Sequence, residues 1–343
     1  MPSRPTIKDI ASEAGVSTAT VDRVLNGRIQ VREETVKKVA EAAHRIGYHA
    51  RNLIDHRLAA NVPTMTFGFV LHKREQEFYQ NFARELEQAV ARRTDIRGRA
   101  VIRFSSDQTP EGFLREIEAI SGRVDSLASS AVNHQSVTRE VRRLKDLGIP
   151  TFAVLNDFAQ GVRENYLGLN NMQIGRLAAW TLTRIQRGPG KIAVFVGGNR
   201  WHGHQLRETG YRSFARESAP DFSVLDTLVN LETDTVTHEA TLDLLSRHSD
   251  LRGIYVAGGG MEGAIAALRE VRAPEEVALV VNELTADSRA ALADGYVTMV
   301  IATPLRELCD DLVDMMVSAV GSGMADLPGQ HFLEPRLHLP ESL

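Results

Sequence analysis

The chain has 343 residues, of which 43% are hydrophobic and 24% are charged. This composition is typical of a folded globular protein, and the length predicts two or three compact units. No stretch approaches the roughly 20 apolar residues of a membrane helix, and the first residues lack the apolar core of a signal peptide. The single cysteine, Cys309, excludes an internal disulfide. We therefore expect a cytoplasmic protein without a membrane partner.

The formal net charge of -4 conceals an asymmetry between the two ends of the chain. Residues 1–60 contain ten Lys and Arg against seven Asp and Glu, whereas the remainder contains 30 against 37. A mildly basic head on an acidic body is typical of a small nucleic-acid-binding module attached to a larger domain. Because the positive excess of the head is small, tight binding would need two heads together, and this favours a homodimer.

Residues 6–27, TIKDIASEAGVSTATVDRVLNG, predict two short helices around a glycine turn. Thr6 can cap the first helix and Ser17 the second, and Gly15 suits the tight turn between them. Apolar residues recur at three- and four-residue spacing, which gives each helix one face for burial. The opposite face of the second helix carries short or hydrogen-bonding side chains, namely Thr18, Ala19, Asp22 and Arg23. This arrangement favours a helix-turn-helix that reads the major groove of DNA, with an ordinary helical hairpin as the alternative.

The same stretch closely resembles the headpiece of the lactose-repressor (LacI/GalR) family of bacterial transcription regulators. The family signature reads TI-x-D-(I/V)-A-x-x-AGVS-x-x-TV-S-RVLN, and only Asp22 departs from its core, where the family usually has serine. In such a headpiece we expect base contacts from Thr18, Ala19 and Arg23. Asp22 can accept a hydrogen bond from a cytosine amine, but it also repels phosphates. The side chains expected to hold phosphates are Thr6, Ser17, Thr20 and Asn26.

A third helix is predicted after the motif, ending at Gly47, and the segment beyond it resembles the hinge of the same family. In that family the hinge forms a short helix only on operator DNA, and a leucine wedges into the minor groove. The resemblance assigns that position to Leu58 when counted from Asn52, and to Arg57 when counted from Tyr48. A plain polar linker is the alternative. We thus expect a helix-turn-helix headpiece over 1–49 and a hinge over 50–63.

From Thr64 onward, strand-like and helix-like runs alternate to the end of the chain. This alternation predicts an α/β fold with doubly wound parallel sheets that helices cover on both faces. Two such series predict two lobes around a cleft, and the body over 64–343 resembles the type I periplasmic binding proteins that share the core of the lactose-repressor family. We expect lobe 1 over about 64–160 and 297–325, and lobe 2 over about 161–296 and 326–343. The run HFLEPRLHL is expected to form the final strand.

The loops after the strands are the candidate ligand-binding segments, because ligands of open α/β sheets bind beyond the carboxyl ends of the strands. Aromatic and polar side chains gather in these loops of the first series, and some of them are expected to be merely solvated. The candidates from this series are His72, Phe78, Tyr79, Asn133, His134 and Asp157.

The second series contains the segment GGNRWHGHQLRETGYRSF (197–214), which resembles a family segment with a sugar-gripping arginine three residues before a glycine. That arginine is Arg207 here, and its guanidinium can hold two hydroxyls or a carboxylate. Trp201 can stack on a sugar or serve as a packing lid. His202 and His204 form an H-x-H pair, but no cysteine or carboxylate at ligand spacing accompanies them. We expect no metal or other cofactor and keep His204 as a ligand-binding candidate.

Three further positions depart from the family pattern. Glu283 stands near the place where many members have a binding Asp, and Gly258 where many have Asn. Asn170 replaces another acid in the segment YLGLNNMQIGRLAAW. These departures predict a changed ligand. The glycine run 258–260 could cradle phosphate at a helix start, but it lacks the G-x-G-x-x-G spacing.

These observations predict a ligand-responsive repressor of a carbohydrate uptake or catabolism operon. It would bind a near-palindromic operator as a homodimer, and a sugar, polyol or sugar phosphate in the interlobe cleft would switch it. A solute-binding protein of a transport system is the alternative, against which the headpiece argues. An enzyme is the second rival, but the sequence shows no nucleophile–base pair, metal set or dinucleotide fingerprint, so no catalytic residue is expected.

Overall fold

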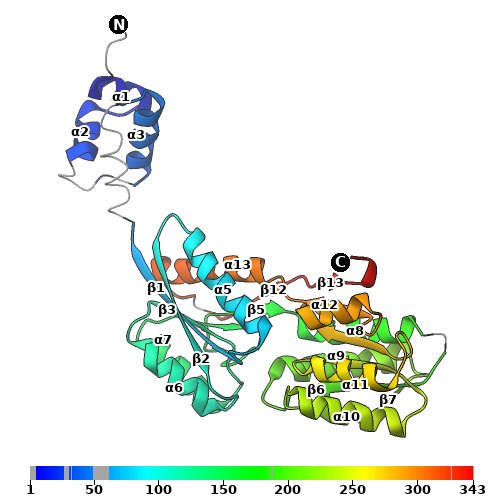
Figure 1. Ribbon diagram of the computed structural model, residues 1–343. Coiled ribbons are helices and arrows are strands. Elements are labelled where there is room, and N and C mark those ends of the chain that lie inside the picture. The colour runs from blue at the N-terminus through cyan, green and yellow to red at the C-terminus, as the bar shows by residue number, and fades with distance from the viewer. Residues whose placement is uncertain are drawn as a thin grey trace. The chain divides into compact units, whose positions relative to one another are not determined.

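The computed structural model describes residues 5–26, 31, 33–48, 62–186, 188–325 and 327–342. Contacts between residues divide the chain into two compact units. The first comprises Met1–Thr64 with Thr94–Arg97, and the second comprises Met65–Arg93 with Gly98–Leu343. The first unit contains the helices of the predicted headpiece, and the second contains both predicted lobes (Figure 1).

The headpiece is a bundle of three helices around a small apolar core. The helices are α1 (Ile7–Ala14), α2 (Thr18–Asn26) and α3 (Glu33–Arg45). Gly15 ends α1 in the left-handed region with φ of 65°, a conformation that costs glycine little. Ile10, Val21 and Val39 come from the three helices and are fully buried. Because isolated helices of this length are marginal in water, this shared core stabilises them.

The helix-turn-helix predicted from the sequence is therefore confirmed in its helices and its turn. Thr6 stands at the N-cap of α1, as predicted, and its backbone N–H donates to Asp9 Oδ2 over 2.7 Å, which is the reciprocal hydrogen bond of a capping box. The hinge, with Leu58 and Arg57, lies outside the described residues. The assignment of a DNA-wedging side chain there stays a prediction.

Lobe 1 is built on a six-stranded sheet with the order β12-β5-β4-β3-β1-β2. Five of its strands, in the order β1, β3, β4, β5 and β12, pair in parallel. Figure 1 shows α5 and α13 on one face of this sheet and α6 and α7 on the other. The strands are β1 (Thr64–His72), β2 (Arg97–Ser105), β3 (Ser126–Ser129), β4 (Thr151–Val154), β5 (Asn165–Leu169) and β12 (Gly329–Leu333); the helices are α5 (Glu77–Arg92), α6 (Pro110–Ser121), α7 (Gln135–Asp146) and α13 (Leu305–Ser322).

Lobe 2 is built on a seven-stranded sheet with the order β13-β11-β10-β9-β6-β7, and β8 pairs with β6. Its strands pair in parallel except β13, which runs antiparallel to β11. The strands are β6 (Lys191–Val196), β7 (Ser223–Val224), β8 (Leu228–Val229), β9 (Leu251–Val256), β10 (Ala278–Asn282), β11 (Met299–Ala302) and β13 (Arg336–His338). The helices are α8 (Asn171–Arg184), α9 (His202–Ser218), α10 (Asp234–Arg247), α11 (Met261–Val271) and α12 (Ala286–Ala293), and a short 3-10 helix, η1 (Pro340–Ser342), follows β13.

The chain crosses between the lobes at other points than the sequence predicts. Strand β5 pairs with β4 in the first sheet, although we expected it in lobe 2. Strand β11 pairs with β10 in the second sheet, although we expected it in lobe 1. The run HFLEPRLHL does not form one strand, because it supplies the end of β12 to the first sheet and β13 to the second. Each of these strands is short, and its sheet is decided by partners that are distant in the sequence.

The fold class itself is confirmed, with two doubly wound lobes and mainly parallel sheets. Strand β10, in the middle of the lobe 2 sheet, is buried along its whole length, as expected for a strand covered on both faces. Cys309 is fully buried on α13 beside Leu308 and Leu312, which fits the structural role that its apolar neighbours indicate. No helix among the described residues has the length and apolar character that a membrane crossing requires.

Candidate functional site

The exposed face of the helix-turn-helix carries the predicted DNA-binding side chains. The N–H of Thr20 donates to Ser17 Oγ over 3.1 Å, so Ser17 caps the start of α2. Asp22 Oδ1 accepts a hydrogen bond from Asn26 Nδ2 over 2.7 Å, which holds both polar groups one turn apart on the same face. Thr20 is half-buried, and the other described candidates are exposed, namely Thr6, Ser17, Thr18, Ala19, Asp22, Arg23 and Asn26. This face is available to DNA, and the individual base and phosphate contacts stay predictions.

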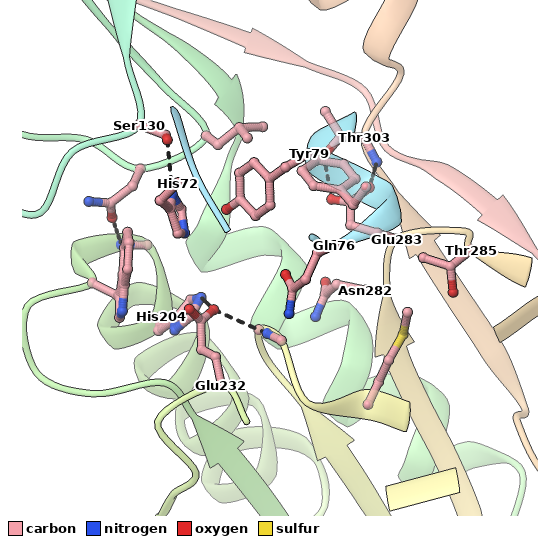
Figure 2. A pocket seen from close by; sticks show the side chains of 18 of the residues that line it. His72, Gln76, Tyr79, Ser130, His204, Glu232, Asn282, Glu283, Thr285 and Thr303 are labelled. Carbon is pink, nitrogen blue, oxygen red and sulfur yellow. Dashed lines mark hydrogen bonds and ion pairs between the residues drawn. The ribbon is translucent and has the colours of Figure 1, made fainter. Parts of the chain in front are cut away.

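The body contains a cavity of about 360 Å³ between the loops at the carboxyl ends of the parallel strands. Lobe 1 contributes the loops after β1, β3 and β4, and lobe 2 contributes the loops after β6, β8, β9, β10 and β11. Figure 2 shows the side chains of both lobes pointing into this space. The location is the one that the rule for open α/β sheets predicts. Eight predicted ligand-binding residues line it: His72, Phe78, Tyr79, Trp201, His204, Arg207, Gly258 and Glu283.

Aromatic side chains from both lobes form one wall of the cavity. The ring centroid of His72 lies 4.3 Å from that of Tyr79 and 4.8 Å from that of Trp201. Trp201 stacks on His72 with an interplanar angle of 27°, and its indole N–H donates to Gln108 Oε1 over 3.1 Å. Phe78 packs edge-on against Tyr79. Such a wall can bury the apolar face of a small polar ligand.

Arg207 is held in the cavity by the close packing of α8 and α9. A Cβ on Gly175 would lie 1.8 Å from the backbone oxygen of Arg207, and a Cβ on Gly210 would lie 2.1 Å from a backbone oxygen of α8. Only glycine permits this approach at either position. Arg207 Nε donates to Asn171 Oδ1 and Nη1 donates to the oxygen of Ala257, both over 2.7 Å. The two hydrogen bonds fix the plane of the guanidinium, as binding of hydroxyls or a carboxylate requires.

An ion pair joins the two lobes beside the cavity. Lys73 follows β1 of lobe 1, and its Nζ lies 2.9 Å from Oε2 of Glu232, which follows β8 of lobe 2. Both side chains are largely buried, with exposed fractions of 12% and 7%. His204 Nε2 lies 3.6 Å from Glu232 Oε1, and its Nδ1 accepts a hydrogen bond from the N–H of Gly197. The neutral imidazole therefore carries its proton on Nε2.

Burial controls the protonation of this cluster. It lowers the pKa of His72 to about 3 and that of His204 to about 4, although the charge of Glu232 opposes the shift. Burial also tends to raise the pKa of Glu232, but Lys73 and, in acid, the protonated imidazoles lower it to about 2. At neutral pH the cluster therefore holds one cation, one carboxylate and two neutral imidazoles.

Glu283 is oriented by the loop after β11. Its carboxylate accepts hydrogen bonds from the backbone N–H of Thr303 over 2.9 Å and from the Thr303 hydroxyl over 2.6 Å. Burial raises the pKa of Glu283 despite these hydrogen bonds and the charge of Arg207. Its backbone has a φ of 69°, which costs a non-glycine residue of the order of 1–3 kcal/mol. Lys73 and Glu232 also have positive φ, so strained backbone recurs around the cavity.

Three predicted ligand-binding residues do not line the cavity. Asp157 is buried against Arg163, whose Nε and Nη2 donate to its two oxygens over 2.5 and 2.8 Å. The His134 side chain accepts a hydrogen bond from the N–H of Ser136 and caps α7. Asn133 is exposed. Each lies in a loop after a strand, but local partners or solvent satisfy its polar groups, and the structure does not bring these three side chains to the cavity.

Several polar residues of the cavity escaped the sequence analysis. Asn171, Asn282 and Thr303 line it, and so does Glu232. Asn282 and Thr303 stand at the ends of β10 and β11, so the same loop rule could have found them. Glu232 follows a strand of only two residues, β8, which left no clear strand end in the sequence.

Comparisons with known proteins agree with both parts of the chain. Residues 67–323 match the periplasmic binding protein domain family, and residues 6–51 match the lacI family of bacterial regulatory proteins. The chain belongs to the lacI family of transcription regulators, with a periplasmic binding protein domain as its body.

Relatives of this lacI-family regulator are similar over much of its length. The HTH-type transcriptional regulator RegA of Clostridium saccharobutylicum is 28% identical over 289 residues, which cover 80% of this chain and 81% of RegA. An uncharacterized HTH-type transcriptional regulator in the aml 5' region of Streptomyces limosus is 27% identical, and the match covers 61% of this chain and 58% of that relative. These relatives are transcription regulators, which are not enzymes.

Solved structures share the fold of the body. A solute-binding protein of an ABC transporter from Burkholderia graminis C4D1M, in complex with D-arabinose, superimposes with a TM-score of 0.74 and 19% identity. The match covers 82% of this chain and 97% of that protein. At this identity the likeness shows the fold alone.

The departures of this regulator from the family pattern have structural reasons. A Cβ on Gly258 would lie 2.3 Å from His204 Cε1 and 2.8 Å from Glu232 Oε1, so the glycine makes room for these two side chains. These two side chains fill the space beside residues 258–260, which disfavours the phosphate site considered for this glycine run. The Asn170 side chain caps α8 by accepting a hydrogen bond from the N–H of Gln173. No group of three or more His, Cys, Asp or Glu in the described part of the chain is arranged to hold a metal ion.

The two buried imidazoles predict that the body loses stability in mild acid. His72 and His204 have pKa values below the ordinary 6.5, so they stay neutral in the folded body and bind protons when it unfolds. Their contribution is complete above pH 6.5 and is lost progressively as the pH falls, toward about 4 for His204 and about 3 for His72. Each should remove about 2 kcal/mol from the free energy of unfolding at pH 5.

Urea unfolding of the full chain between pH 7.5 and pH 5 measures this loss. The variants His72→Gln and His204→Gln should each show a shallower dependence of the unfolding free energy on pH. Glu232 does not interfere, because a carboxyl with a lowered pKa loses its contribution only below about pH 4.5. Parallel pH profiles for the parent and both variants would contradict the prediction.

Proposed function

We propose that this lacI-family regulator represses a carbohydrate uptake or catabolism operon as a homodimer in the cytoplasm, bound to the nucleoid. Two headpieces bind the halves of a near-palindromic operator. A sugar, polyol or related small molecule in the interlobe cavity switches the regulator. The single observation that carries this proposal is one chain with both an exposed helix-turn-helix face and a cavity whose walls come from two lobes.

The contacts across the cavity support a switch that depends on lobe closure. The N–H of Gly203 in lobe 2 donates to Asn156 Oδ1 in lobe 1 over 3.1 Å, and the N–H of Ala286 in lobe 2 donates to Glu77 Oε2 in lobe 1 over 3.0 Å. With the ion pair between Lys73 and Glu232, these contacts hold the lobes closed. A ligand that binds this arrangement more tightly than an open one shifts the population toward it. The change of the lobes is then the signal passed toward the hinge, where Leu58 is proposed to act.

A solute-binding protein of a transport system is the second candidate, since proteins of that kind share the fold of the body. The headpiece favours the function of a regulator, because an exposed helix-turn-helix binds DNA and solute transport does not involve DNA. Electrophoretic mobility shifts separate the two functions. The full chain at low salt should retard a palindromic operator from its own genomic neighbourhood more strongly than random DNA of equal length. Equal retardation of the two DNAs, or no retardation of either, would exclude the function of a transcription regulator.

Arg23→Ala should relax the preference for operator over random DNA by about 1–3 kcal/mol, or about 5- to 150-fold. Arg23 is exposed on α2 in the position of a base-reading side chain, and a lost bidentate contact to guanine removes discrimination. Competition titrations with both DNAs at fixed salt measure the ratio. Arg45→Ala is the control, because Arg45 lies on α3 and its Nε is 2.9 Å from Glu13. An unchanged ratio in Arg23→Ala would exclude a base contact.

A further inference from the structure

The walls of the cavity carry a large excess of negative charge. One cationic side chain among the lining residues that the structure describes, Arg207, faces seven carboxylates. Lys73 adds a second cation beside the cavity, but Glu232 neutralises it. The seven acids are Glu75, Glu77, Glu232, Asp234, Glu262, Glu283 and Asp287.

Three of these acids lie on lobe 2 and have no positively charged side chain as a partner among the described residues. Asp234, Glu262 and Asp287 lie in the first turns of α10, α11 and α12, and none forms an ion pair with the described residues. Burial raises the pKa of Glu262, and the charges of Asp234 and Asp287 raise it further. The helix dipoles offset only part of this charge, since each supplies about half an elementary charge. The cluster is therefore short of a positive charge.

A second feature of the cavity indicates an absent hydrogen-bonding partner. His72 is 1% exposed and lines the cavity, and its Nε2 has no hydrogen-bond partner among the described residues. The other ring nitrogen, Nδ1, lies 3.2 Å from Ser130 Oγ, and a dashed line marks this contact in Figure 2. A buried polar atom without a partner costs about 1–3 kcal/mol, and a hydroxyl group of a ligand would remove this cost.

We propose that the effector carries an ammonium group as well as hydroxyl groups, as an amino sugar or an amino polyol does. The ammonium lies against Asp234, Glu262 and Asp287, and a hydroxyl binds His72 Nε2. A metal ion does not fit as the missing cation, because the acids are not arranged to hold one. A sugar phosphate would add negative charge to a wall that already has an excess of it. This inference rests on the proposed effector site and narrows its ligand class.

Isothermal titration of the full chain with matched pairs tests the ligand class. The pairs are D-glucosamine with D-glucose, D-galactosamine with D-galactose, D-mannosamine with D-mannose, and 1-amino-1-deoxy-D-sorbitol with D-sorbitol. D-Glucose 6-phosphate and magnesium chloride serve as anionic and metal probes. The tightest binder should be an amine, and its hydroxyl counterpart should bind at least about tenfold more weakly. A neutral sugar, the phosphate or magnesium as tightest binder would overturn the inference, and so would no binding by any amine.

Variants of the acidic cluster connect the preference to these residues. Glu262→Gln should remove most of the difference between the amine and its counterpart and leave the affinity for the neutral member nearly unchanged. Glu111→Gln is the control, because Glu111, like Glu262, lies in the first turn of a helix, that of α6, but it is exposed and away from the cavity. An unaltered preference in Glu262→Gln would overturn the placement of the ammonium.

The same samples separate this inference from the proposed function. If the amine binds but leaves the affinity for operator DNA unchanged, the proposed switching by an effector is refuted and the proposed ligand class is supported. If a neutral sugar binds more tightly and releases or promotes operator binding, the function stands and the ammonium is refuted.

Discussion

Lys73→Met is expected to weaken effector binding by about two orders of magnitude or more. The variant leaves the Glu232 carboxylate buried at the lobe interface without its cation, with an exposed side-chain fraction of 7%. Breaking a buried ion pair by removal of one partner costs about 3–5 kcal/mol. Because Lys73 and Glu232 belong to different lobes, separation of the lobes relieves this cost by returning water to the carboxylate. The closed arrangement that encloses the cavity is therefore the state that the substitution penalises.

Calorimetric titration with the tightest ligand of the sugar and amino sugar pairs measures the loss, and small-angle scattering measures the lobe separation. The double variant Lys73→Met/Glu232→Gln should recover a large part of the affinity, because it removes the buried charge along with its partner. Asp243→Asn is the control, since Asp243 pairs with Arg247 on the surface, where such pairs contribute about 0–1 kcal/mol. Equal affinities for the single and double variants would show that the unpaired charge is not the cause.

The headpiece could be predicted from the sequence because its structure is local. Helices α1 and α2 begin at the capping residues Thr6 and Ser17, and the turn between them needs a glycine with positive φ, so the helix-turn-helix can be predicted from residues 6–27 alone. The exposed side chains of α2 follow from the same periodicity that buries Val21 and Val24. What periodicity could not supply is the hydrogen bond between Asp22 and Asn26, which depends on the rotamers of both side chains.

The fold class of the two lobes could be predicted from the sequence, but the assignment of individual strands to one lobe or the other could not. Alternating apolar runs predict strands and helices, and the fold class follows from them. Strands β5, β11 and β12 have only four or five residues and no feature that assigns them to one sheet. Their assignment depends on pairing across long stretches of chain, for example between β12 and β5, and such pairing leaves no periodic signal in the sequence.

The site shows the same division between local and distant information. The loop rule located His72 and Glu283 because each immediately follows or ends a strand. It also selected Asp157, whose carboxylate instead accepts hydrogen bonds from Arg163, six residues later in the chain. It missed Glu232, whose importance arises from Lys73, 159 residues away. The sequence therefore indicates which loops carry polar groups, whereas only the folded structure identifies the distant residues that these groups contact.

Arg207→Ala is expected to abolish the response to effector while the affinity for operator DNA remains near its normal value. The guanidinium lines the cavity and is fixed by Asn171 and the backbone oxygen of Ala257. Hydrogen bonds to charged groups contribute about 1.5–3 kcal/mol each, so two lost contacts to the ligand would lower its affinity at least about a hundredfold. The headpiece has its own apolar core, around Ile10 and Val21, and does not depend on Arg207 for its folding.

Mobility shifts on operator DNA, with and without the tightest ligand, measure both quantities in one experiment. Arg207→Lys should restore little of the response, because an ammonium cannot reproduce the planar fork that Asn171 and Ala257 orient. Arg216→Ala is the control, since Arg216 is exposed on the same helix, α9, and does not line the cavity. A normal response in Arg207→Ala would remove this arginine from the effector site. A parallel loss of operator affinity would mean that the substitution damages the fold, which the free energy of unfolding by urea would reveal independently.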